Sequence, residues 1–139
     1  MGQVVKRDLA LSIEVMLQLM HQMESDLLDT TPMERENLIM IGAYCVICYC
    51  GSFRGHEVFL ADLDGLIREN YKIKQSGKHN YVIVLLLGRF KGETGERCYL
   101  TPLAAETKSG IKVKFWIDLL VALHEGRGRT NVPAFCTME

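Results

Sequence analysis

The feature that most constrains the fold is an apolar run of 13 residues over positions 38–50. Three signals just before the run mark the start of a helix. Thr31 is a suitable N-cap, Pro32 fits the first turn, and Glu34 completes a capping box. A helix that is apolar on all sides has to be covered by other elements. We therefore predict a central buried helix over residues 32–50.

Hydrophobic spacing predicts further helices on both sides of this one. Ser12 is a suitable N-cap, and apolar residues then recur every three to four positions, which predicts an amphipathic helix over about 13–28. The same spacing predicts a third long helix over about 109–125. A short helix over about 53–59 is expected directly after the central one.

A β-hairpin is predicted between the second and third long helices, over about 80–102. Residues 81–87 form a strongly β-forming run, and residues 97–101 supply the returning strand. The connection between them contains a glycine-rich turn. Pro102 is expected to end the pairing because proline lacks the backbone N–H that a strand ladder uses.

The segment before the hairpin is predicted to contain no helix. We expect a loop over residues 61–70, around Asp64-Gly65, and a short strand over residues 71–74. The predicted fold class is α+β and mainly helical, with three main helices and a small antiparallel hairpin. The 139 residues suit a single domain.

Charge is divided unevenly along the chain, although the net charge is only -1. Residues 8–66 carry ten acidic side chains against two arginines, a balance of -8. Residues 67–114 carry ten Lys or Arg side chains against four Glu, a balance of +6. This division predicts a basic face that can meet nucleic acid; a solvated charged surface is the alternative.

The five cysteines do not suggest a disulfide framework, because three of them lie in the apolar run and the total is odd. We expect a soluble intracellular protein in a reducing compartment, with no choice between nucleus and cytoplasm. The apolar run is too short to span a bilayer, so no membrane partner is expected. The spacing Cys45-x-x-Cys48-x-Cys50 resembles part of a metal site, but no matching second ligand pair follows. We predict no metal and no cofactor.

Arg54 and Glu57 stand at the exit of the apolar run, three residues apart. On a helical turn this spacing puts both side chains on one face. An arginine fork can bond two phosphate oxygens at once, and a nearby carboxylate can hold the fork in place. The alternative is a surface ion pair with no further role.

The order of these motifs resembles the catalytic domain of the tyrosine recombinases, the phage integrase-like family. Residues 51–57, Gly-Ser-Phe-Arg-Gly-His-Glu, resemble the family's joint after an apolar helix, with the first catalytic arginine and a carboxylate three residues later. Residues 90–97 resemble its hairpin with a lysine near the tip, and Leu-Thr-Pro-Leu at 100–103 resembles the strand that follows. The resemblance covers about residues 6–125.

This resemblance implies a role for each matching residue on a DNA phosphodiester. Arg54 would bind the phosphate oxygens in the transition state. Lys91 would act as general acid toward the leaving 5′ oxygen. Glu57 would orient the arginine, and Arg89 and Arg97 would contact the DNA backbone.

The sequence departs from the family pattern in its last third. The last tyrosine is Tyr99, inside a predicted strand, so no residue matches the family's nucleophile. His124 and Arg127 have the family's His-x-x-Arg spacing, but they stand at a predicted helix end, where a histidine also suits the helix dipole. The family's separate N-terminal DNA-clamping domain has no counterpart.

The resulting hypothesis is a truncated or degenerate tyrosine recombinase that binds duplex DNA and does not cleave it alone. The 139 residues would form a single partial catalytic domain. Helices absent from such a partial domain would leave apolar surface exposed, which favours self-association. Two alternatives remain open: a non-catalytic nucleic-acid-binding module, or a protein-interaction domain whose Arg54–Glu57 pair is structural.

Overall fold

A computed structural model describes residues 12–51, 58–59, 61–77, 80–88, 97–128 and 134–135, apart from the side chains of residues 87, 88 and 97–99. This part of the chain is α+β and mainly helical, as predicted. Its helices and its two-stranded antiparallel sheet are α1 (Ile13–Leu27), α2 (Pro32–Gly51), α4 (Leu63–Gln75), β1 (Tyr81–Gly88), β2 (Arg97–Ala104) and α5 (Val113–Gly126).

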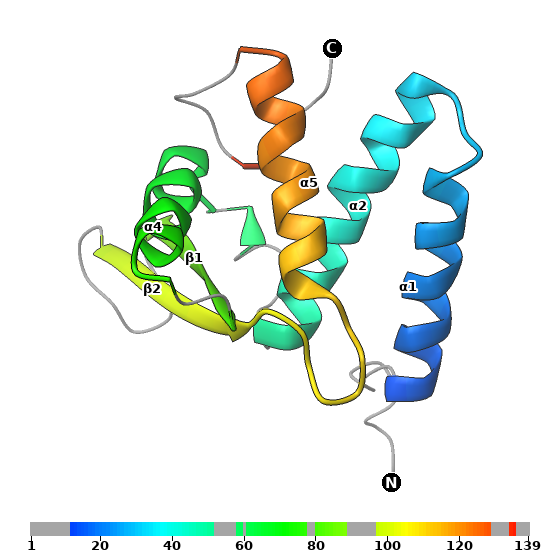
Figure 1. Cartoon of the computed structure of the whole chain (residues 1–139), viewed down its shortest axis with the longest axis horizontal. Helices are drawn as coiled ribbons and strands as arrows, with labels where there is room; N and C mark the ends of the chain where they lie inside the picture. The colour runs from blue at the N-terminus through cyan, green and yellow to red at the C-terminus, as the bar shows by residue number, and fades with distance from the viewer. Residues whose placement is uncertain are drawn as a thin grey trace, which may run out of the picture.

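Helix α2 lies between α1 and α5, and the sheet with α4 lies on the far side of α5 (Figure 1). The start of α2 agrees with the prediction: the Thr31 hydroxyl accepts from the Glu34 N–H at 3.3 Å and donates to the Glu34 carboxylate at 2.8 Å. Helix α1 is capped by Ser12, whose hydroxyl accepts from the Val15 N–H at 3.2 Å. Both starts are therefore set by local sequence.

The prediction that α2 is buried on all sides is only partly correct. Its buried side consists of Ile39, Gly42, Ala43, Val46 and Ile47, whereas the Ile41 side chain is 53% exposed. Helices α1 and α5 make the larger packing contacts with α2, and β2 contacts it as well, but these contacts leave part of its surface exposed. At Gly42, α5 comes so close that a β-carbon would lie 2.3 Å from Cζ3 of Trp116.

The core is shared by all four described helices and the sheet. It is built almost entirely from apolar side chains, and its largest fully buried member is Trp116. Val82, Val84 and Leu86 alternate along β1 and turn one face of that strand into the core.

The predicted hairpin is confirmed as an antiparallel pair, with a register that runs from Gly88 opposite Arg97 to Tyr81 opposite Ala104. The prediction that Pro102 ends the pairing is wrong, because β2 continues to Ala104. Pro102 stands opposite Ile83, whose N–H and C=O both bond to a side chain on the other edge of β1. The pair is thus a non-hydrogen-bonded one, where a missing N–H costs nothing.

The loop predicted over 61–70 and the strand predicted over 71–74 are both wrong, because α4 occupies most of this segment. Its N-cap is Asp62, whose carboxylate accepts from the Gly65 N–H at 2.8 Å. The Asp64-Gly65 pair suggested a turn, but Gly65 lies inside the helix, against β1. A helix-destabilising glycine is kept here because it lets the two elements approach closely.

The last long helix begins four residues later than predicted, at Val113 rather than Ser109. A turn precedes it, in which the Gly110 N–H donates to the Thr107 carbonyl at 3.0 Å. Gly110 has φ +106, a conformation that a right-handed helix does not contain. The short helix predicted over 53–59 falls mostly outside the described residues.

Candidate functional site

Most of the site residues predicted from the sequence lie outside the part of the chain that the structure describes. These are Arg54, Glu57, Arg89 and Lys91. The backbone of Arg97 is described and pairs with Gly88 at the start of β2, but its side chain is not. What the structure supplies is the framework from which these segments leave.

An antiparallel bridge joins Ala61 to Leu86 of β1, outside the two-stranded sheet. The Asp62 N–H donates to the Leu85 carbonyl at 2.9 Å beside it. In the sequence, Glu57 comes four residues before Ala61, and Arg89 comes three residues after Leu86. In the sequence, the joint segment thus precedes one of the two bridged residues and the hairpin connection follows the other.

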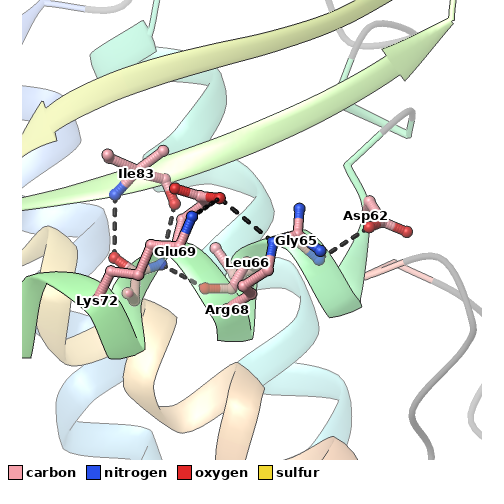
Figure 2. Close-up of polar contacts among 8 residues, drawn as sticks. Asp62, Gly65, Leu66, Arg68, Glu69, Lys72 and Ile83 are labelled. Atoms are coloured by element: carbon pink, nitrogen blue, oxygen red, sulfur yellow. Dashed lines mark hydrogen bonds and ion pairs between the residues drawn. The ribbon is translucent and has the colours of Figure 1, made fainter.

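Helix α4 begins at this bridge and covers the edge of β1 that β2 leaves open. Its Asn70 carries this contact: the amide nitrogen donates to the Ile83 carbonyl at 2.9 Å, and the amide oxygen accepts from the Ile83 N–H at 3.0 Å (Figure 2). The same nitrogen also donates to the Leu66 carbonyl at 2.7 Å. One side chain thus takes the place of a third strand at this position.

Helix α4 was not predicted, although the sequence of this segment contains signals for a helix. Asp62 is a good N-cap, and Leu63, Leu66, Ile67 and Ile73 stand at helical spacing. Gly65 argued against a helix, because a glycine after Asp64 is typical of a turn. A β-carbon there would lie 2.0 Å from Cδ2 of Leu85, so this glycine is a packing residue and not a turn residue.

A compact charged group stands on the outer side of α4, formed by Arg68, Glu69 and Lys72 (Figure 2). The Glu69 carboxylate lies 3.3 Å from both the Arg68 Nε and the Lys72 Nζ. The Glu69 side chain is 13% exposed, against 55% for Arg68 and 64% for Lys72. The carboxylate is therefore drawn inward, while the two cations face solvent.

The pKa of Glu69 reflects two opposed influences. Its partial burial acts to raise the pKa, but the hydrogen bonds from Lys72 and Arg68, with their positive charges, lower it below its ordinary value. A lowered carboxyl pKa stabilises the folded state above the pKa of the unfolded chain, about 4.3. That contribution is lost as the pH falls through the lower, folded-state value.

Glu69→Gln should therefore lower the melting temperature at neutral pH, with a difference from wild type that shrinks below about pH 4. Thermal unfolding followed by circular dichroism at several pH values measures the effect. Glu125→Gln is the matched control, because Glu125 is exposed on α5 and its carboxylate has no ion pair among the described residues. A pH-independent difference for Glu69→Gln would contradict the assignment.

The His124-x-x-Arg127 spacing is used for packing and not for a shared site. His124 is fully buried in the last turn of α5, and its Nε2–H donates to the Ala134 carbonyl at 2.8 Å. Arg127 instead pairs with Glu36 near the start of α2, and its Nε lies 3.1 Å from the carboxylate. The two side chains therefore serve different contacts.

The cysteines of α2 have the properties of packing residues. Burial raises the pKa of the Cys45, Cys48 and Cys50 thiols, so the metal-binding and nucleophilic thiolate is scarce at neutral pH. Burial, together with the neighbouring Cys48, also raises the pKa of the Tyr44 hydroxyl. The described residues contain no group of three or more His, Cys, Asp or Glu side chains placed to hold a metal ion.

Comparison with models of protein families, with curated proteins and with solved structures gives no match. Among the described helices, none combines the length and the apolar character that crossing a bilayer requires.

Proposed function

We propose that this protein binds the phosphate backbone of duplex DNA in the manner of a tyrosine recombinase, through Arg54 and Lys91, and does not cleave DNA by itself. The observation that carries the proposal is the bridge between Ala61 and Leu86. The segment with Arg54 and Glu57 precedes Ala61 in the sequence, and the segment with Arg89 and Lys91 follows Leu86. A phosphate site that uses both segments requires such a junction.

The framework around the bridge supports this proposal further. The strands β1 and β2 pair in register up to Gly88 and Arg97, and residues 89–96 connect them. In a recombinase-type site, the lysine of this connection protonates the leaving oxygen, while the joint arginine stabilises negative charge on the phosphate. Glu57 orients that arginine, and Arg89 and Arg97 contact the DNA backbone.

The absence of cleavage follows from the residues that recombinase chemistry uses as nucleophile and as later ligands. Tyr99 is the last tyrosine of the 139 residues, and its backbone lies within β2, paired with Leu86. His124 and Arg127 are both held in structural contacts. The site proposed for this chain thus contains groups that bind phosphate and no group that attacks it.

The test is binding of a fluorescent duplex at a series of salt concentrations. Wild type should bind at low salt, and its affinity should fall steeply as salt rises. Arg54→Ala and Lys91→Ala should each weaken binding and reduce the slope of log affinity against log salt by about 0.9, because each removes one phosphate contact. Circular dichroism should show that both variants remain folded.

Arg35→Ala is the matched control. Arg35 is exposed near the start of α2, and the bridge follows the other end of that helix, which is about 24 Å away along its axis. This variant loses the same charge and should keep the wild-type slope. A nicked duplex should trap no covalent adduct, and an adduct on tyrosine would disprove the lack of cleavage. If wild type does not bind duplex DNA at low salt, the proposal is wrong and a protein-interaction role for the Arg54–Glu57 pair gains support.

A further inference from the structure

We infer that the exposed face of α4 formed by Arg68, Tyr71, Lys72 and Gln75 is a second contact for the backbone of duplex DNA. We call these four residues the α4 face. The inference rests on the proposed function, and it adds residues that the sequence pattern did not single out. The four residues align only because this segment is a helix. The loop and strand predicted from the sequence would not have placed them on one side.

The spacing of the four residues places them on one side of the helix. They stand at positions i, i+3, i+4 and i+7, which align along an α-helix. All four are exposed, and the Tyr71 side chain is 61% exposed. The opposite side of α4 is occupied, since Leu63, Leu66 and Ile73 are buried and Asn70 bonds to β1.

The chemistry of the α4 face fits a phosphate backbone. Arginine, lysine, tyrosine and glutamine are side chains that donate hydrogen bonds to phosphate oxygens. Arg68 and Lys72 are four residues apart, about 6 Å along the helix axis, so they can contact the same strand of a duplex. The face contains no aliphatic side chain, which disfavours an apolar protein partner.

The position of Glu69 supports the same conclusion. This carboxylate contacts both cations, yet it is the least exposed of the three side chains. An approaching anion therefore meets the guanidinium and the ammonium group first. Asp64 stands one turn before Arg68 and marks the acidic limit of the face.

The α4 face is continuous with the proposed phosphate site. Asp62, which takes part in the bridge through its N–H, is also the N-cap of α4. From there the helix runs antiparallel to β1, with Asn70 opposite Ile83. A duplex bound at the bridge can therefore extend along the helix and add contacts at Arg68 and Lys72.

The experiment compares two double variants in the salt titration of duplex binding. Arg68→Gln with Lys72→Gln should weaken binding about tenfold or more near 0.1 M salt, and should reduce the slope by about 1.8. Arg35→Gln with Lys108→Gln removes one Arg and one Lys charge from exposed positions outside α4, on α2 and in the turn before α5, and should keep the wild-type slope. Lys72→Gln alone should reduce the slope by about 0.9, which tests the face if the double variant folds poorly.

The outcomes separate this inference from the proposed function. If Arg54→Ala and Lys91→Ala weaken binding but the α4 variants keep the wild-type slope, only the α4 face is wrong. If the α4 variants lose affinity and Arg54→Ala does not, the α4 face stands and the proposed site is wrong. Equal slope changes in the two double variants would overturn the α4 face, because they would show a general charge effect. No duplex binding by wild type would overturn both.

Discussion

Replacing Gly42 with alanine is expected to destabilise the protein by up to about 2 kcal/mol, although alanine is the better helix former. A β-carbon at this position would lie 2.3 Å from Cζ3 and 2.5 Å from Cε3 of Trp116. The indole ring is rigid and fully buried, so it cannot move aside without displacing α5 from α2. Overpacking of this kind costs about 1–3 kcal/mol, which exceeds the gain in helix propensity of about 1 kcal/mol.

Denaturant unfolding measures this effect, and Gly126→Ala is its control. Gly126 is also a helical glycine, but apart from its chain neighbours and the backbone of its own helix, no described atom lies within 4 Å of where its β-carbon would be. That variant should be as stable as wild type or slightly more stable. Trp116→Phe should relieve part of the clash. The loss of stability that Trp116→Phe causes should therefore be smaller in the Gly42→Ala variant than in wild type. Equal stability of Gly42→Ala and Gly126→Ala would show that α2 and α5 are farther apart than described.

Asn70→Asp is expected to cost about 3 kcal/mol at neutral pH, because the substitution leaves the Ile83 carbonyl without its donor and places a charged carboxylate against it. The amide nitrogen of Asn70 donates to the carbonyls of Leu66 and Ile83, and a carboxylate would place negative charge against both oxygens. The shape of the side chain hardly changes. The effect therefore reports the hydrogen bonds that attach α4 to the edge of β1.

The loss should depend on pH in a direction that the contact dictates. Because the two carbonyl oxygens disfavour the ionised form, the introduced carboxyl group should have a higher pKa in the folded than in the unfolded chain. Below the unfolded pKa of about 3.9, the introduced carboxyl group is protonated in both the folded and the unfolded chain. As the pH rises through the higher folded pKa, the variant loses stability relative to that low-pH value. The free energy of unfolding of wild type and of Asn70→Asp, measured at pH 4 and pH 7, tests this.

The control for this prediction is Asn37→Asp, the same substitution at an exposed position of α2. It should change stability by less than about 0.5 kcal/mol. If the two Asn→Asp variants unfold alike, Asn70 does not hold the sheet edge. Hydrogen exchange offers a second readout in another variant, since the Ile83 N–H, whose acceptor is the Asn70 side-chain oxygen, should lose protection in Asn70→Ala.

The starts of α1 and α2 were predictable because their causes are local. Ser12 and Thr31 accept from backbone N–H groups three residues later, so each cap depends on a few neighbouring residues. The hairpin was predictable for a similar reason, since β-forming runs on both sides of a glycine-rich turn favour pairing with each other. Nothing outside these segments is needed to account for them.

The incorrect predictions concern residues whose structural role depends on a contact with a distant part of the chain. Gly65 suggests a turn in sequence, but the approach of Leu85 makes it a helical packing residue. Pro102 suggests the end of a strand, but it falls at a non-hydrogen-bonded position of the pair with β1. In both cases the partner is about 20 residues away in the chain, and local pattern contains no information about it.

The sequence by itself determined the α+β class, the caps, the hairpin and the candidate residues Arg54, Glu57, Arg89 and Lys91, because each depends on local spacing or on the chemistry of a side chain. Only the tertiary structure decided that α4 covers the open edge of β1 and that His124 serves the interior. It also decided that Ala61 pairs with Leu86, beside the two segments that contain the candidate residues. These features depend on long-range hydrogen bonds and close packing, which exist only once segments far apart in the sequence have come together.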